Sequence, residues 1–198
     1  MSASRGVGFT VKAGIERLGV DGLRHALCSL NPESADVEFT WEHAAELRRT
    51  GLLGAIANPV YRVASLLWSR YEGRTDAQAW ADAVSEREAA GARLESIGVM
   101  FRDAELREAL SLVQAVGAEV NRTLAKEEPW RLPHEEGHRV LTRLLPALDV
   151  LGVASWPVVP ETASRIRRIL GREIEPRGWS LEEGPPVIRD APVPPLQL

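Results

Sequence analysis

The stretch DAELREALSLVQAVGAEVNRTLAK, residues 103–126, decides the fold class. Its apolar side chains recur every three or four positions, which is the spacing of one face of an α-helix. They are Leu106, Leu110, Val113, Val116, Val120 and Leu124. A helix with one long apolar face buries that face against other helices or a sheet. The sequence therefore predicts a helix over 103–126 that packs into a larger helical assembly.

The segments before and after this stretch show the same spacing. Thr40 is a good N-cap for a long helix that extends to about Tyr71, and Pro59 inside it predicts a kink. Asp76 is expected to cap the next helix, with a slip of register near 89–91. The inner face of that helix is expected to contain Trp80, Ala83, Val84, Leu94 and Ile97. A further helix is predicted over 135–151, with a second kink at Pro146.

The two ends of the chain are predicted to be less regular. Short helices are expected over 11–18 and from Asp21, a good N-cap, to the residue before Asn31, followed by an exposed, extended segment over 33–39. Pro160 suits the first turn of another short helix, which Gly171 would end. Beyond residue 172 the chain is rich in proline, but its apolar residues indicate a partly ordered tail. The fold class predicted is all-α, an antiparallel helix bundle.

Composition excludes several classes of protein. The net charge of -4 argues against broad, sequence-independent binding of nucleic acid, although it leaves room for a local basic face. No apolar run reaches the length of about 18 residues that a membrane span needs. The N-terminus lacks the pattern of a secretory signal, and the single Cys28, expected to be a buried thiol, fits a reducing cytoplasm.

Three islands of sequence carry a family resemblance. The first is MSASRG at 1–6, which is similar to the KMSKS loop and its following Arg-Gly. The second spans 54–73 and contains Asn58, Arg62 and Tyr71. The third comprises Asn121-Arg122, Glu128-Pro129-Trp130 and the stretch PVVPETA at 157–163. Together they resemble the C-terminal portion of a methionyl-tRNA synthetase, a class I aminoacyl-tRNA synthetase.

This resemblance implies an organisation in three parts. Residues 1–39 would form a KMSKS-like loop and a stem-contact-like connecting segment. Residues 40–171 would form the anticodon-binding helix bundle, and residues 172–198 a C-terminal extension that packs back on the body. Apolar surface is expected to be exposed over 1–39, because that end abuts the catalytic domain in the resembled enzymes.

The catalytic part of such an enzyme is not in this sequence. ATP and methionine would bind a separate nucleotide-binding domain, so no cofactor is expected in this chain. The residues at the KMSKS position are Met1, Ser2, Ala3 and Ser4. Ala3 replaces a lysine that would stabilise the leaving pyrophosphate, and residues 1–9 are alternatively a plain leader segment. The chain is expected to be inactive as a methionine–tRNA ligase on its own.

The resemblance also implies a binding site for the CAU anticodon of methionine-type tRNA. Trp130 would stack on a splayed base, held rigid by Pro129, with Asn121, Arg122 and Arg62 beside it. Alternatively, Trp130 closes the end of the bundle and Asn121 satisfies local backbone groups. No metal site is predicted, since His134 and His138 share a helix face but have no evident third ligand.

Departures from the family pattern favour a second interpretation. Ala3, Val63 and Thr123 stand where the family commonly has other residues and favour it, and Gln114 is a further departure. A synthetase-like paralogue could instead activate an amino acid for secondary metabolism, or act as a scaffold that binds no RNA. Arg165, Arg167, Arg168 and Arg172 form a cluster that either meets phosphates or remains a solvated helix face. Trp41, Trp68, Trp80 and Trp156 are expected in the core.

Methionine-dependent pyrophosphate exchange by this chain alone is expected to be absent. One preorganised charge at an oxyanion-like site contributes about 2–4 kcal/mol of transition-state stabilisation, and here the lysine position is Ala3. The assay measures exchange of labelled pyrophosphate into ATP with methionine. Robust exchange by the isolated chain would overturn this interpretation.

Overall fold

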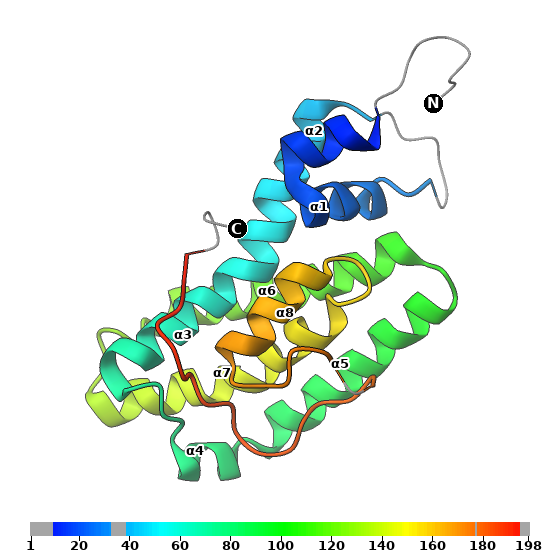
Figure 1. Cartoon of the computed structure of the whole chain (residues 1–198). Helices are drawn as coiled ribbons and strands as arrows, with labels where there is room; N and C mark the ends of the chain where they lie inside the picture. The colour runs from blue at the N-terminus through cyan, green and yellow to red at the C-terminus, as the bar shows by residue number, and fades with distance from the viewer. Residues whose placement is uncertain (1–9, 33–38, 177, 195–198) are drawn as a thin grey trace.

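The computed structural model describes residues 10–32, 39–176 and 178–194, and this part of the chain is helical with no strand. Figure 1 shows a bundle with a smaller helical arm at its N-terminal end. The elements in order are α1 (Val11–Ser29), α2 (Trp41–Leu47), the π-helix η2 (Arg48–Ala57), α3 (Asn58–Tyr71), α4 (Ala77–Asp82), α5 (Val84–Arg102), α6 (Leu106–Glu127), α7 (His134–Ala154) and α8 (Pro160–Ile169). The predicted all-α class is confirmed.

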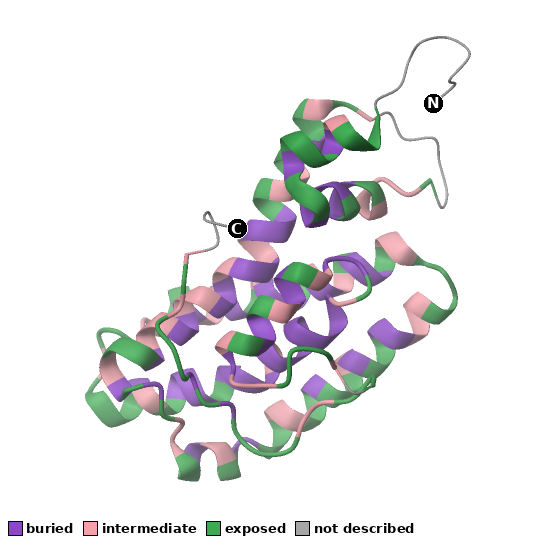
Figure 2. Cartoon of the chain, viewed as in Figure 1, coloured by how far each residue is buried: buried purple, intermediate pink, exposed green. Residues whose placement is uncertain are grey.

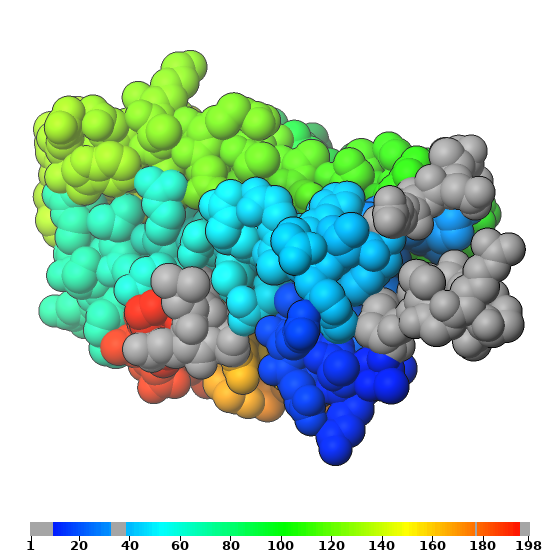
Figure 3. Space-filling model, turned by 90° about the horizontal axis from the view of Figure 1, so that it is seen from above, coloured from blue at the N-terminus to red at the C-terminus, as the bar shows by residue number. Residues whose placement is uncertain are grey.

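The arm consists of α1 and α2. Gly19 has φ 74° and ψ 169°, so α1 is two helical pieces joined at a kink, close to the two short helices that the sequence predicted. Residues Leu18, Leu23, Ala26 and Ala44 form a small core of their own. In the space-filling view from above (Figure 3), α1 stands out from the body as the dark blue region. Part of the predicted extended segment, residues 33–38, lies outside the described residues.

The long helix predicted from Thr40 to Tyr71 is present as α2, η2 and α3. The Thr40 hydroxyl accepts a hydrogen bond from the His43 N–H at 3.1 Å, which confirms the predicted cap. Near Pro59 the chain takes ten residues of wider π-helical turns immediately before α3. Proline has no N–H for the preceding turn, and π turns are one way in which a helix accommodates the missing bond.

The main core lies between α3, α5, α6 and α7. The α6 residues Leu110, Val113, Val116, Val120 and Leu124 are all buried, as predicted. Leu106 is half-buried because α6 begins there and not at residue 103. Figure 2 shows buried residues where α3, α7 and α8 face one another and exposed residues along the outer side of α5.

Two expectations about the second long segment and the tryptophans are wrong. Asp76 caps α4 through a 2.8 Å bond from the Ala79 N–H, but the helix breaks at Ala83 and not near 89–91. Val84 is therefore turned outward and is 48% exposed. Trp68 is 38% exposed, and the other three tryptophans expected in the core are half-buried. Large indole rings are often only partly covered.

Asp21 and Arg24 join the arm to the bundle. Asp21 was predicted to cap its own helix, but its carboxylate accepts a 2.6 Å hydrogen bond from the Thr162 N–H in the first turn of α8. Arg24 donates to the carbonyls of Val158 at 2.6 Å and Pro157 at 2.8 Å. The PVVPETA stretch, which includes the start of α8, is thus hydrogen-bonded to α1.

The C-terminal segment lies along the bundle. The Ile188 N–H donates to the Gly73 carbonyl at 3.0 Å, and the Trp179 indole N–H donates to the Leu94 carbonyl at 2.5 Å. Of the four clustered arginines, Arg167 pairs with Glu182 and Arg172 with Asp149, both as buried guanidinium groups. Arg165 and Arg168 are exposed. The cluster is therefore divided between internal ion pairs and solvent.

Helices η2 and α6 cross at backbone distance. A Cβ atom added to Gly117 would lie 1.6 Å from the Ala55 carbonyl oxygen, so only glycine permits this approach. Four residues further along α6, the Asn121 amide donates to the Gly54 carbonyl at 3.1 Å. The crossing therefore needs a residue without a side chain at position 117.

Replacing Gly117 with alanine is expected to lower the free energy of unfolding by about 1–3 kcal/mol or more, the usual cost of overpacking a close contact. Gly91→Ala on α5 is a matched control, because nothing lies within 4 Å of the added Cβ. The control should be neutral or stabilising by about 0.5–1 kcal/mol. Urea unfolding followed by circular dichroism measures both. Equal effects for the two variants would contradict the close crossing.

His25 is a buried base at the same crossing. Its side chain is fully buried, its Nε2 lies 3.1 Å from Gln114 Nε2, and its Nδ1 has no hydrogen-bond partner among the described residues. Loss of hydration lowers the pKa of His25 from 6.5 to about 4. The folded protein therefore holds a neutral imidazole where the unfolded chain would bind a proton.

The free energy of unfolding is expected to fall as the pH falls from 6.5 to about 4. In this range the unfolded state binds a proton at His25 that the folded state lacks, which amounts to about 3 kcal/mol over the full interval. Above pH 6.5 this contribution no longer changes. Chemical unfolding at several pH values, compared with His25→Gln, isolates the effect from that of the carboxylates. Identical pH dependence in both proteins would refute it.

Candidate nucleic-acid interface

Trp130 lies in the loop between α6 and α7, at the end of the bundle away from the arm (Figure 1). Helix α6 ends at Glu127, and the next residue, Glu128, has the left-handed conformation with φ 42°, which turns the chain sharply. Pro129 is then buried, and Trp130 follows it with 39% of its surface exposed. The Trp130 indole is therefore accessible to a ligand, and it directly follows a buried residue.

Three groups fix the backbone of this loop. Arg70, near the end of α3, donates from Nη1 to the Pro129 carbonyl at 2.8 Å. The Tyr71 hydroxyl donates to the His134 carbonyl at 2.8 Å, where α7 begins. A Cβ on Gly137 would lie 2.5 Å from the Pro129 oxygen, so the absence of a side chain there lets the loop pack against α7.

The two histidines of α7 pack against Tyr71 at the end of α3. His138 stacks on the Tyr71 ring, with centroids 4.1 Å apart and an interplanar angle of 7°, and His134 lies tilted against the same ring. Their Nε2 atoms lie 3.1 Å from the Arg70 carbonyl and 2.9 Å from the Arg74 carbonyl. His134 therefore lies against a carbonyl that the end of α3 leaves open, and His138 against a carbonyl of the turn that follows α3.

Asn121 and Arg62 bond to each other. Arg62 Nη1 donates to Asn121 Oδ1 at 2.8 Å, and the Asn121 amide N–H₂ donates to Gly54. Both side chains are half-buried, whereas Arg122 is exposed. The Asn121 amide is thus already engaged within the protein, as the alternative interpretation of this residue supposed.

The predicted site residues follow one edge of the bundle. Arg62 meets Asn121 and Arg70 meets Pro129, and each pair is separated by 59 positions in sequence. Helix α3 and the chain from Asn121 to Pro129 therefore run side by side in the same direction. Sequence reasoning did not single out Arg70, because its place beside Pro129 depends on this tertiary contact.

Two further expectations concern residues away from this edge. The KMSKS-like residues 1–4 lie outside the described residues. Val63, one of the predicted departures from the family pattern, is completely buried in the main core. The substitution there falls in the packed interior, so it carries no information about an exposed RNA-binding surface.

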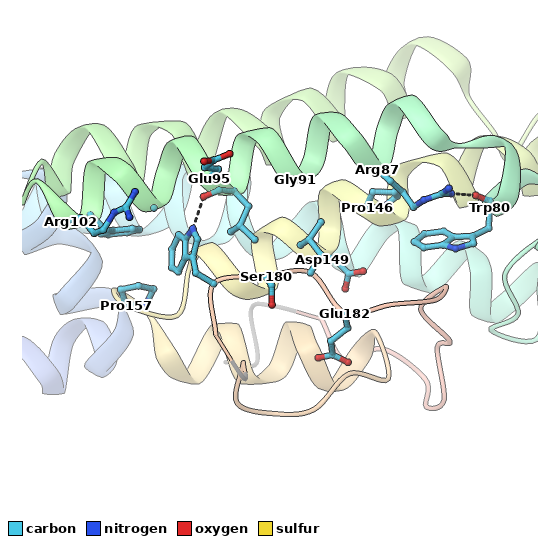
Figure 4. A pocket seen from close by; sticks show the side chains of 15 residues that line it. Trp80, Arg87, Gly91, Glu95, Arg102, Pro146, Asp149, Pro157, Ser180 and Glu182 are labelled. Carbon is cyan, nitrogen blue, oxygen red and sulfur yellow. Dashed lines mark hydrogen bonds between the residues drawn. The ribbon is translucent and has the colours of Figure 1, made fainter.

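A cavity of about 970 Å³ lies between α5 and the C-terminal segment. Figure 4 shows Arg102 and Pro157 at one end, Trp80 and Arg87 at the other, and Asp149 and Glu182 between them. Both of these carboxylates are paired with arginines, Asp149 with Arg172 and Glu182 with Arg167. Burial raises the pKa of the Asp149 carboxyl, and its bonds to Arg172 act in the opposite direction. The two carboxylates at the middle of the cavity are therefore engaged within the protein.

The sequence of this chain is similar to those of known proteins of one family. Residues 1–64 match the family described as tRNA synthetases class I (M). Methionine–tRNA ligase of Thermomicrobium roseum is 32% identical over 177 residues, which cover 86% of this chain and 30% of the relative. The ligase of Chlorobium chlorochromatii is 26% identical over 99% of this chain and 28% of its own length. The chain thus spans less than a third of these relatives.

The fold has a counterpart among solved structures. The free form of Mycobacterium tuberculosis methionyl-tRNA synthetase matches with a TM-score of 0.70 and 24% identity, over 92% of this chain and 40% of that one. The same enzyme in complex with methionyl-adenylate matches with a TM-score of 0.71. The chain is related to the class I aminoacyl-tRNA synthetases. Within that family it resembles the C-terminal portion of the methionyl enzymes, as its motifs predicted.

Proposed function

We propose that this chain is the tRNA-binding module of a methionyl-tRNA synthetase-like protein and binds the CAU anticodon loop. The observation that carries this proposal is the exposed Trp130 ring directly after the buried Pro129, at one end of the bundle. Single-stranded loops are recognised by stacking of splayed bases on such rings. Stacking of one base contributes about 1–3 kcal/mol.

The neighbouring residues have separate roles in this proposal. Arg122 is exposed and offers a guanidinium group to a phosphate or base edge. Arg62 and Asn121 are half-buried and joined by a hydrogen bond, so they orient one another at the same edge. Pro129 holds the Trp130 backbone in place. Together they would provide one stacking surface with cationic groups beside it.

The module would support methionylation of tRNA only together with a catalytic domain that binds ATP and methionine. The α1 surface supports such a partner, because Val11, Ile15, Val20 and Leu27 are 41–66% exposed, as expected for apolar surface at that end. The arm over 1–39 would then be the stem-contact-like connection, and the protein would act in the cytoplasm, where translation takes place. No described helix is long and apolar enough to cross a membrane.

One observation favours the second candidate, a synthetase-like scaffold that binds no RNA or serves amino-acid activation elsewhere. Asn121 uses its oxygen for Arg62 and its nitrogen for Gly54. A residue engaged in this way stabilises the crossing of η2 and α6 whether or not RNA binds. Under this alternative, Trp130 would close the end of the bundle.

Trp130→Ala is expected to weaken binding of an initiator or elongator methionine tRNA by about 5- to 150-fold, because the base then has no ring on which to stack. Trp68→Ala is the matched control. Trp68 is 38% exposed, nearly the same as Trp130, but it points about 200° away from Arg70 around α3. Fluorescence anisotropy with labelled RNA measures the affinities.

An unrelated tRNA and a methionine tRNA with an altered anticodon complete the experiment. Binding that depends on the CAU sequence and disappears only in Trp130→Ala supports the first candidate. Affinity that is absent, or indifferent to the anticodon, rejects anticodon recognition and favours the scaffold.

A further inference from the structure

Arg70 has more hydrogen-bonding capacity than its bond to the loop uses. Its Nη1 donates to the Pro129 carbonyl, and its guanidinium lies 5.7 Å from the centroid of the Tyr71 ring. A guanidinium carries five N–H donors in a rigid fork. Within the described part of the chain, the remaining donors of Arg70 have no acceptor.

The other arginines near this loop are differently placed. Arg131 pairs with Glu128 at 2.9 Å, and Arg74 pairs with Glu72 at 2.8 Å. Arg70 has no acidic partner among the described residues and is half-buried. A half-buried cation is less screened by solvent than an exposed one, so its attraction for an anion is stronger.

The position of Arg70 follows from the same hydrogen bond. The carbonyl that it holds belongs to Pro129, the residue directly before Trp130. The Arg70 guanidinium is therefore held one residue away from Trp130, and we expect the sugar-phosphate backbone of a base stacked on that ring to come near it. Sites for single-stranded nucleic acid combine an aromatic ring with a cation that follows the backbone in this way.

We propose that Arg70 is a further residue of the RNA site, which binds the phosphate flanking the base on Trp130 while it positions the loop through Pro129. This inference rests on the proposed function. Phosphates of single-stranded RNA are the ligand, and the arginine fork suits two of their oxygens. Tyr71 differs from Arg70 in this respect, since its hydroxyl bonds only to the His134 carbonyl and so positions the loop without carrying charge.

The test is the salt dependence of binding to an anticodon stem-loop RNA. Removing one cation that neutralises a phosphate reduces the slope of log affinity against log salt by about 0.7 for single strands. Arg70→Gln is expected to lower this slope by about that amount and the affinity by about tenfold or more. Arg70→Lys keeps the charge, so it should retain most of the slope with an intermediate affinity.

Three controls separate phosphate binding from loop positioning. Arg102→Gln makes the same change of charge at the far end of the bundle, at the end of α5, and should leave the slope unchanged. Tyr71→Phe removes only the positioning hydroxyl, and Trp130→Ala only the stacking ring, so both should lower affinity without altering the slope. Thermal unfolding of each variant confirms that it is folded.

The outcomes distinguish this inference from the function on which it rests. One outcome is that Arg70→Gln has the same salt slope as the unaltered chain while Trp130→Ala still weakens binding. This outcome overturns the proposal that Arg70 binds phosphate and leaves the proposed function standing. It would leave Arg70 as a support of the loop. No binding by the unaltered chain at low salt overturns both proposals.

Discussion

The close crossing of η2 and α6 is the contact on which the rest of this structure depends. It uses a second stripe of α6, beside the apolar one, formed by Gln114, Gly117 and Asn121 at helical spacing. The Gln114 side chain contacts that of His25, next to Gly51. Gly117 leaves room for the Ala55 carbonyl. The Asn121 amide donates a hydrogen bond to the Gly54 carbonyl. The backbones approach because this stripe has a small residue at its centre and hydrogen-bonding residues on both sides. The crossing therefore sets the position of α3, which continues directly from η2.

That position brings the candidate interface together. With α3 beside α6 and running in the same direction, Arg62 reaches Asn121, and Arg70 reaches Pro129 two turns later. The loop that carries Trp130 is then fixed by α3 on one side and by α7 on the other, through Arg70, Tyr71 and Gly137. The arm is joined to the bundle at two places, through Asp21 and Arg24 to the start of α8 and through His25 to Gln114 at the crossing. A change at the crossing would thus be expected to reach both the Trp130 loop, through α3, and the arm, through His25.

Local patterns predicted the helices well and their partners poorly. The α6 stripe and the caps at Thr40 and Asp76 are confirmed, since periodicity and N-capping act within a few residues. Val84 was assigned to an inner face, but the break at Ala83 rotates it outward. Asp21 has the composition of an N-cap for its own helix and caps α8 instead, because the folded chain brings α8 to it. Trp130 was named through resemblance, whereas Arg70 emerged only from its hydrogen bond to Pro129.

The sequence by itself determined the helical class, the approximate extent of the long helices and the relationship to the methionyl-tRNA synthetases. These depend on residue spacing and on motifs, which are present in the unfolded chain. Only the tertiary structure decided which carbonyl accepts from Arg70, why Gly117 has no side chain and how His25 comes to be buried as a neutral base. Such features arise from groups far apart in sequence, and their energies exist only once packing has excluded water and fixed the distances between them.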